Sequence, residues 1–456
     1  MLVTIKNILV IVISTLSFFI ASSINNTGLF ETGILSLHHH HHHHHHRHKK
    51  HHNCHKPNHI SVRKHKHVFN VDAFGAKGDG ITDDSKAFKR AWSKFCKSRG
   101  GILVIPRKRT YLLSPMHFNG PCQPNLNLNL HGTIKASGDK DDYRKDREHW
   151  LKFNNLRNFA VKGGGVVDGN GHVWWKESCK VKTTETCDSG ITPFAMTFQN
   201  GINISVKGLL FRNSQRMHLV FSNSQMVRAS NLVIKAPGDS PNTDGIHVSR
   251  TTDVVISDSF IGTGDDCISI VNGSTNVKVL RVICGPGHGI SIGSLGKHEN
   301  LEEHVSNVDV KTVMLKGTTN GVRIKTWQGG KGSARNIKFE NVVMQNVTNP
   351  IIIDQYYCDK PRDKIGDNLP CVEKEQAVQV SDVVYRNIRG TSAKEVAIKL
   401  ECSEMVPCRG ILLQNVHLMR ERAGAVKAKC SNVKYETKGS VFPRCQDTYT
   451  SHSPLL

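Results

Sequence analysis

The stretch VVISDSFIGTGDDCISIVNGSTNVKVLRVICGPGHGISI, residues 254–292, decides the fold because it contains one pattern twice. Each half begins with a short run of alternating apolar and polar residues, passes through a glycine-containing bend and ends in a second apolar run. Alternation with a period of two is typical of strands with one buried face. No segment within either half has room for a helix. The stretch therefore predicts a repeating all-β structure.

The pattern recurs over most of the chain. Successive runs begin 23 to 31 residues apart, except for two gaps of 45 and 46 residues. Since each long gap is about twice a short one, we expect each to contain an additional turn. The runs begin at Phe159, Ile204, Val227, Val254, Val277, Val308, Ile337, Val383 and Ile411. Repeats of this length indicate a solenoid, and without the Leu pattern of leucine-rich repeats a right-handed parallel β-helix is favoured.

The β-helix domain is expected to span residues 68–446, with a tail at residues 447–456. A helical pattern begins near residue 84, after Thr82 and Asp83, either of which is a good N-cap. Its apolar face consists of Ala87, Phe88, Ala91, Trp92 and Phe95. A single amphipathic helix at the start of a solenoid predicts an N-terminal cap that closes the open end of the core.

Residues 1–67 are expected to lie outside this domain. Lys6 precedes an apolar run at residues 8–20, the pattern of a secretory signal peptide that ends near residue 23. The run is short for a membrane span, and the alternative is an uncleaved signal anchor. Residues 24–67 include nine consecutive histidines and no apolar periodicity, which predicts a disordered linker. The linker is either a solvated spacer or a tether to an acidic matrix that strengthens as its histidines are protonated.

Cysteine usage also indicates secretion. Twelve of the thirteen cysteines fall into neighbouring pairs, whereas Cys54 lies in the linker. The expected bridges are Cys96–Cys122, Cys179–Cys187, Cys267–Cys284, Cys358–Cys371, Cys402–Cys408 and Cys430–Cys445. Close CxxC pairs are absent, which disfavours a zinc site, and no metal is expected. Sequons at Asn203, Asn272 and Asn346 predict glycosylation.

Four polar islands interrupt the repeats: NTD at residues 242–244, DD at 265–266, GHG at 287–289 and RIK at 323–325. Adjacent strands lie about 4.8 Å apart, so residues at one phase of neighbouring coils become neighbours in space. Asp265 of the DD island and His288 of the GHG island each lie eleven residues after the start of a run. The two adjacent aspartates must sit at a bend, because a straight strand would turn them to opposite faces.

Three carboxylates without metal-ligand spacing favour acid–base chemistry on a glycosidic bond. An inverting glycosidase uses one carboxylic acid to protonate the leaving oxygen and another carboxylate to activate water. Mutual repulsion would raise the pKa of at least one carboxyl group, which suits a general acid. The alternative is that these aspartates cap turns, but four islands in phase favour a single site.

The sequence resembles the polygalacturonases of glycoside hydrolase family 28 from about residue 69 to residue 445. The four islands correspond to the active-site motifs of that family, and FGAKGDGITDD (74–84) and NPIIIDQYYC (349–358) are similar to its plant branch. The resemblance implies a right-handed parallel β-helix, no cofactor, and hydrolysis of pectin with inversion. It implies a secreted, monomeric enzyme of the extracellular cell wall.

The resemblance also implies a role for each residue. Asp265 would be the general acid, Asp244 and Asp266 would activate water, and His288 would orient the acid. Substrate would be bound by Arg323, Lys325, Asn242, Tyr357, Gly287 and Gly289. Tyr356 is an alternative to Tyr357. The chain departs from the family at Gln215, where a proline is usual, and Arg216 adds a charge. We expect this departure to lie near the cleft, one coil before Asp244, and to alter subsite preference more than chemistry.

The formal charge of +23 attracts acidic polymers of any class, so charge alone does not identify the partner. With the resemblance, we expect homogalacturonan as the partner, cleaved in endo rather than exo fashion. We expect no nucleic acid, and no membrane once the signal is removed. The remaining alternatives are calcium-dependent elimination, as in pectate lyases, and a non-catalytic pectin-binding wall protein.

Overall fold

The computed structural model describes residues 67–179, 181, 192–298, 300–358 and 372–445. The chain divides into two units, residues 1–63 and 64–456, and all described residues belong to the second. The predicted signal peptide and tail lie outside the described residues, as does the linker apart from its last residue. No helix within the described ranges has the length and apolar character needed to cross a membrane.

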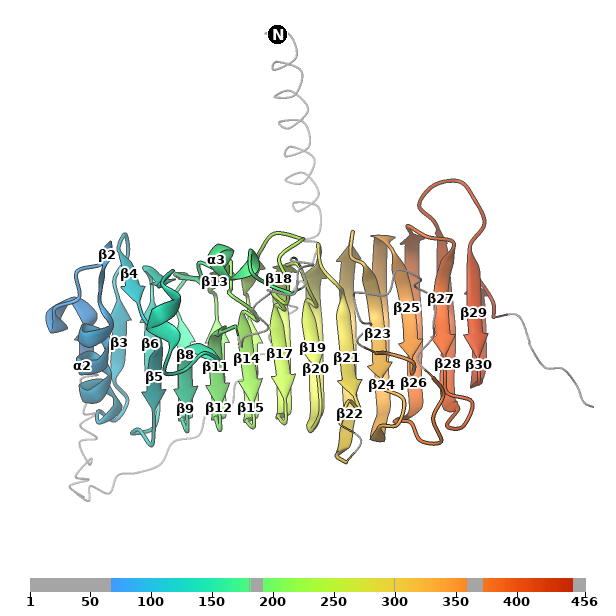
Figure 1. The fold of residues 1–456 in the computed structure, drawn as a ribbon, viewed down its shortest axis with the longest axis horizontal. Coiled ribbons are helices and arrows are strands. Elements are labelled where there is room, and N and C mark those ends of the chain that lie inside the picture. The colour runs from blue at the N-terminus through green and yellow to red at the C-terminus, as the bar shows by residue number, and fades with distance from the viewer. Residues whose placement is uncertain (1–66, 180, 182–191, 299, 359–371, 446–456) are drawn as a thin grey trace, which may run out of the picture. The chain divides into compact units, whose positions relative to one another are not determined.

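The second unit is built from two parallel sheets, so the predicted parallel β-helix is confirmed (Figure 1). The 19-stranded sheet contains β1 (Val68–Asn70), β2 (Asp79–Asp83), β3 (Ile102–Ile105), β4 (Thr110–Leu113), β6 (Leu126–Leu130), β7 (Thr133–Ala136), β9 (Arg157–Lys162), β10 (Val166–Asp168), β12 (Ile202–Lys207), β13 (Leu210–Arg212), β15 (Gln225–Ser230), β16 (Val233–Lys235), β18 (Thr252–Gly262), β20 (Ser274–Cys284), β22 (Glu302–Lys316), β24 (Lys331–Val347), β26 (Gln379–Ser392), β28 (Cys408–Arg420) and β30 (Val433–Phe442). The 11-stranded sheet contains β5 (Met116–Asn119), β8 (His149–Asn154), β11 (Phe194–Gln199), β14 (Leu219–Ser222), β17 (Ile246–Ser249), β19 (Ile268–Ile270), β21 (Ile290–Leu295), β23 (Asn320–Thr326), β25 (Asn349–Asp354), β27 (Val396–Glu401) and β29 (Lys427–Ser431).

The nine predicted runs pair in one continuous ladder across β9, β12, β15, β18, β20, β22, β24, β26 and β28. The additional turns expected in the two long gaps are absent from this ladder. Phe159 pairs directly with Ile204, and Ile337 pairs directly with Val383. The described residues of each gap therefore add no strand to this ladder, and a longer connection between coils costs little conformational entropy.

A left-handed backbone residue immediately precedes each run and lies within the same strand. At Asn276, Asn307 and Asn336 φ is 56°, 57° and 53°, values that asparagine tolerates better than most residues. Their side chains also form a ladder, because Asn307 donates to Asn276 over 3.0 Å and Asn336 donates to Asn307 over 2.6 Å. These corners fix the phase of every coil.

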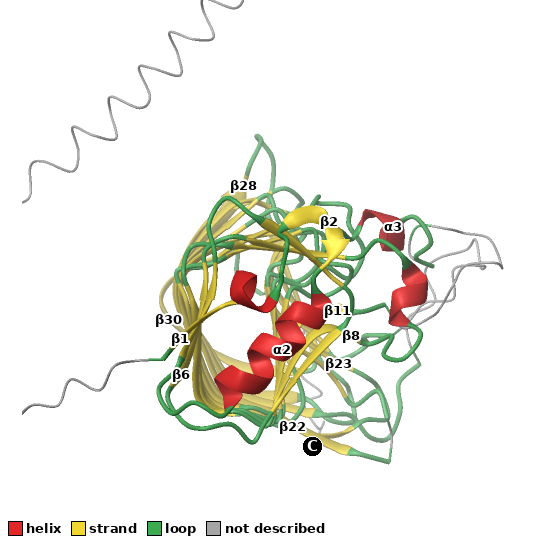
Figure 2. Ribbon diagram, turned by 90° about the vertical axis from the view of Figure 1, so that its left-hand side faces the viewer, coloured by secondary structure: helices red, strands yellow, loops and turns green. Residues whose placement is uncertain are grey.

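Helix α2 (Ser85–Cys96) buries Ala87, Phe88, Ala91, Trp92 and Phe95, the predicted apolar face. It lies across one end of the stack of coils, as the predicted cap should (Figure 2). The predicted N-cap is wrong by one or two residues. Asp84 is the N-cap, and its carboxylate accepts hydrogen bonds from the backbone N–H groups of Lys77 and Gly78 instead of capping the helix. The other helical segments in the described part of the chain are η1 (Val71–Phe74), η2 (Lys140–Tyr143) and α3 (His172–Trp175).

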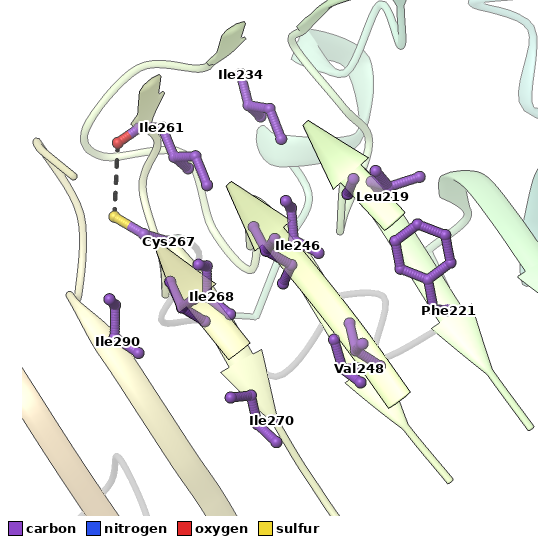
Figure 3. Packing of buried hydrophobic residues seen from close by; sticks show 14 of the residues in the cluster. Leu219, Phe221, Ile234, Ile246, Val248, Ile261, Cys267, Ile268, Ile270 and Ile290 are labelled. Carbon is purple, nitrogen blue, oxygen red and sulfur yellow. Dashed lines mark hydrogen bonds between the residues drawn. The ribbon is translucent and has the colours of Figure 1, made fainter. Parts of the chain in front are cut away.

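The interior of the 11-stranded sheet sets the direction of its outer side chains. Figure 3 shows Leu219, Ile246, Ile268 and Ile290 as neighbours in the core, and all four are fully buried. Because side chains alternate along a strand, residues between these buried positions point out of the core. The hydrophobic core therefore fixes a row of polar side chains on the outer face.

Four predicted disulfides are confirmed, namely Cys96–Cys122, Cys267–Cys284, Cys402–Cys408 and Cys430–Cys445. The predicted bridges of Cys179 with Cys187 and of Cys358 with Cys371 each include a residue outside the described ranges. Cys54 also lies outside them. The confirmed bridge at Cys267 lies next to the aspartate pair and ties that bend to the end of β20.

Candidate active site

Four strands of the 11-stranded sheet present one outward row in register. His247 of β17 pairs with Ser269 of β19, Ser269 with Ser291 of β21, and Ser291 with Arg323 of β23. The three aspartates lie in the bends that enter these strands, so their carboxylates and this row share one face. The predicted convergence of separate coils on one site agrees with this geometry.

The aspartate pair lies at a bend, as predicted, since neither Asp265 nor Asp266 belongs to a strand. The predicted equal phase of Asp265 and His288 is wrong by one residue. The strands pair Ile268 with Ile290, which puts Asp266 rather than Asp265 level with His288. The reason is that the bend before β21 is one residue shorter than the bend before β19.

Asp266 is the most heavily bonded carboxylate of the site. Its Oδ1 accepts from Arg323 Nη2 at 2.8 Å and from Ser291 Oγ at 2.7 Å, and its Oδ2 accepts from Lys325 Nζ at 3.0 Å. Its side chain is 2% exposed, and those of the two cations are 13% and 11% exposed. Ile324 is fully buried between the cations, as the alternation predicts. Both cations therefore bond an enzyme carboxylate, and the cluster carries one net positive charge.

Asp265 contacts the histidine of the GHG motif. His288 Nδ1 lies 3.0 Å from Asp265 Oδ1, and the backbone N–H of His288 donates to the Asp265 carbonyl oxygen at 2.8 Å. The two glycines that flank His288 are required by the backbone packing, in addition to any space that they leave for a sugar. A Cβ on Gly287 would lie 2.7 Å from the Asp265 carbonyl oxygen, and one on Gly289 would lie 2.1 Å from that of Asn320. Glycine at both positions lets neighbouring coils approach closely.

Asp244 is buried and has no directly bonded cation among the described residues. Its Oδ2 accepts from Ser269 Oγ at 2.8 Å. Burial, together with the charges of Asp265 and Asp266, raises the pKa of Asp244 to about 8. The predicted rise for one carboxyl group of the trio therefore falls on Asp244, whereas the resemblance gives the acid role to Asp265.

Aromatic rings border the site beside the RIK motif. Lys325 Nζ lies 5.3 Å from the ring centre of Tyr357, which makes an edge-to-face contact with Trp327 at 5.8 Å. Tyr356 instead donates its hydroxyl to Glu373. Of the two tyrosines weighed from sequence, Tyr357 is the one beside the cations.

The first two residues of the NTD island have structural roles. Asn242 adopts φ 56° in the turn before Asp244, and among the described residues its side chain has no hydrogen bond to the carboxylates. Thr243 is fully buried, and its Oγ1 accepts from the backbone N–H of Gly264 at 3.0 Å. Thr243 thus joins the two aspartate bends, a role that its sequence position did not indicate.

The unusual segment at residues 215–216 lies one coil before Asp244. Gln215 is 1% exposed and its amide lies 3.3 Å from the Tyr143 hydroxyl, so it faces the interior rather than the cleft. Arg216 lies 5.1 Å from the ring centre of Phe194, and its charge lowers the pKa of His247. The added charge therefore reaches the site, whereas the glutamine does not.

One ligand atom from each of Asp265, Asp266 and His288 lies within 4.8 Å of the others, a spacing that a metal ion could bridge. The oxygens of Asp266 already bond two cations and a hydroxyl, which lowers the affinity of this trio for a metal. The prediction that the site uses no metal stays a prediction.

Comparison with known proteins gives consistent matches. The family "Glycosyl hydrolases family 28" matches residues 96–441. A polygalacturonase of Malus domestica is 52% identical over 379 residues, 83% of this chain and 79% of that protein. Polygalacturonase-2 of Solanum lycopersicum is 48% identical over 390 residues, 85% of this chain and 83% of that protein. The crystal structure of an endo-xylogalacturonan hydrolase from Aspergillus tubingensis is 25% identical with a TM-score of 0.68, and the match covers 82% of this chain and 100% of that one.

Proposed function

This chain belongs to glycosyl hydrolases family 28, and we propose that it hydrolyses the α-1,4-galacturonosyl linkages of homogalacturonan with inversion. That it is a pectin-degrading glycoside hydrolase follows from its plant relatives, which are named polygalacturonases and are about half identical over most of their length. The observation that carries the proposal is the cluster in which Arg323 and Lys325 bond Asp266 next to the contact between Asp265 and His288.

The proposed reaction needs one carboxylic acid and at least one carboxylate in the same cleft. Asp266 bonds two cations, surroundings that suit a carboxylate acting as a base. The raised pKa of Asp244 means that the trio retains a proton at neutral pH, as an acid requires. We propose that this shared proton resides on Asp265, oriented by His288, when the substrate reacts, and that it passes from there to the leaving oxygen. Asp244 and Asp266, both ionised in that state, are proposed to take the proton of the attacking water.

Substrate carboxylates are proposed to bind the face of Arg323 and Lys325 that Asp266 leaves unneutralised. Arg323 and Lys325 each carry a positive charge in a site that is mostly shielded from water. Such a charge attracts galacturonate and rejects neutral sugars, because an unpaired buried charge is costly. Tyr357 offers a ring beside Lys325 for the face of a sugar.

Incubation of the purified protein with de-esterified homogalacturonan tests the proposal. We expect new reducing ends without ultraviolet absorbance, and a mixture of oligomers if cleavage is endo. An unsaturated, ultraviolet-absorbing product would establish elimination instead. Binding without cleavage, unchanged in Asp265→Asn, would establish a non-catalytic wall protein.

Secretion to the cell wall as a monomer is proposed on the sequence pattern of residues 1–23 and on the predicted bridges. Amino-terminal sequencing of protein collected from the medium should begin near residue 24. The linker is proposed as a tether to acidic polysaccharide. Deletion of residues 27–67 should reduce retention on pectate at pH 5 more than at pH 7, because fewer histidines are charged at the higher pH.

A further inference from the structure

Behind Asp244 lies a chain of two hydrogen bonds that the reaction scheme leaves unused. Ser269 Oγ donates to Asp244 Oδ2 at 2.8 Å, and His247 Nδ1 lies 2.8 Å from the same Ser269 Oγ. Ser269 is 3% exposed. The strand register that pairs His247 with Ser269 holds the two side chains in contact.

The direction of both bonds follows from proton counting. A serine hydroxyl has one proton, and when Asp244 is ionised, as the base must be, its carboxylate accepts that proton. Ser269 Oγ must therefore accept from His247 Nδ1, which fixes that histidine as the Nδ1–H tautomer. Burial and the charges of Arg216, Lys325 and Arg250 lower the pKa of His247 to about 4, against the opposite effect of Asp266, so the ring is neutral.

A parallel arrangement lies one coil further on. Arg323 Nε donates to Ser291 Oγ at 3.0 Å, and Ser291 Oγ donates to Asp266 Oδ1 at 2.7 Å. The difference is the outer donor, which is a permanent cation behind Asp266 and a neutral imidazole behind Asp244. A neutral donor orients a carboxylate without lowering its proton affinity as far as a cation does, and a stronger base results.

We propose that Ser269 and His247 are positioning residues that hold Asp244 in the orientation and proton affinity of the water-activating base. The inference rests on the proposed function, because it assigns the partners of that base. His218 supports the same residue from the backbone side: its Nε2 accepts from the Ser214 N–H, and its Nδ1 donates to the Asp244 carbonyl oxygen at 3.1 Å. The charged groups that face Asp244 are Asp265, Asp266 and Lys325.

The test compares variants by kcat, KM and pH profile on de-esterified homogalacturonan. We expect Ser269→Ala to lower kcat by about 10- to 100-fold with little change in KM. The acid limb of its kcat/KM profile should move up by about one to two pH units, the effect of losing one hydrogen bond to an ionised group. His247→Leu should produce a smaller shift in the same direction. His247→Asn, which keeps a donor near the position of Nδ1, should restore the wild-type limb.

The matched control is Ser249→Ala, a serine on the same outward face of β17, which should leave the pH profile unchanged. Combining Ser269→Ala with His247→Leu should add nothing to Ser269→Ala, because the histidine acts only through the hydroxyl. An unmoved acid limb in Ser269→Ala, or additive effects in the double variant, would overturn the inference. If the wild-type protein cleaved no homogalacturonan, the proposed function would fail. The pH dependence of unfolding in Ser269→Ala would then still decide the inference, through the proton affinity of Asp244.

Discussion

Replacing Asp244 by asparagine should stabilise the protein while abolishing hydrolysis. The pKa of Asp244 rises from 3.8 to about 8 in the folded state, so the folded protein must keep a proton that the unfolded chain releases. When the pKa of an acid is raised by folding, the folded protein loses stability as the pH increases from the pKa in the unfolded chain toward the pKa in the folded protein. Asparagine is a neutral mimic of the protonated acid and removes this dependence.

The size of the effect follows from pH alone over most of the window. At pH 5 the loss in free energy of unfolding depends on the difference between the pH and the unfolded pKa of 3.8. It amounts to about 1.6 kcal/mol, whether the folded pKa is 7 or 9. At pH 7 it grows to about 4 kcal/mol by the same relation. Below pH 3.8 the two proteins should be equally stable, because both unfolded chains are then neutral at this position.

Urea unfolding of wild type and Asp244→Asn at pH 3.5, 5 and 7 measures the difference. The control is Asp266→Asn, which leaves Arg323 and Lys325 buried without their carboxylate and should cost about 3–5 kcal/mol. Changes of opposite sign in the free energy of unfolding for the two variants, whose aspartates lie on neighbouring bends, would distinguish an electrostatic effect from general damage to the site. A pH-independent difference, or an Asp244→Asn variant less stable than wild type at pH 7, would refute the reasoning.

Three further predictions concern charge and covalent bonds. Lys325→Met keeps an apolar contact with Tyr357 but removes one cation from Asp266, so kcat/KM on homogalacturonan should fall by about 100-fold or more, as measured by reducing-end kinetics. Removing the Cys267–Cys284 bridge by a double alanine substitution frees a loop with a sequence separation of 17 and should lower the free energy of unfolding by about 3 kcal/mol. Raising NaCl from 20 to 200 mM should lower kcat/KM by roughly tenfold, because screening shortens the attraction between a chain of charge +23 and an acidic polymer.

The repeat register could be predicted from sequence because inner and outer positions differ in chemistry. An apolar residue at the start of each run, usually valine or isoleucine, and a left-handed residue before it, most often asparagine, mark the same point in every coil. All nine predicted starts are paired. The prediction of an additional turn in each long gap was wrong because the spacing between runs depends on the length of the connecting chain as well as on the number of turns. A coil accepts a long outward connection without changing the ladder, so a doubled spacing does not require a doubled coil.

The charged residues of the site were predictable, whereas their partners were not. An aspartate pair or a glycine-flanked histidine interrupts the alternating apolar pattern of the repeats and can be recognised in the sequence, as at Asp266 and His288. Ser269 and Ser291 occupy ordinary outward positions in short apolar strands, so no local pattern distinguishes them from solvent-facing residues. Their importance arises only when the register brings each hydroxyl to an aspartate from the preceding coil.

The same limit explains why the ion pairs between Asp266 and the two cations of the RIK motif were not predicted. Alternation along β23 correctly puts both side chains outside the core, but it does not state what they meet there. The bend before β19 brings Asp266 between them, so the substrate meets a cluster with one net charge rather than two free cations. Substrate recognition at this point therefore involves Asp266, a residue proposed to activate water, because the two cations proposed to bind the substrate also bond its carboxylate.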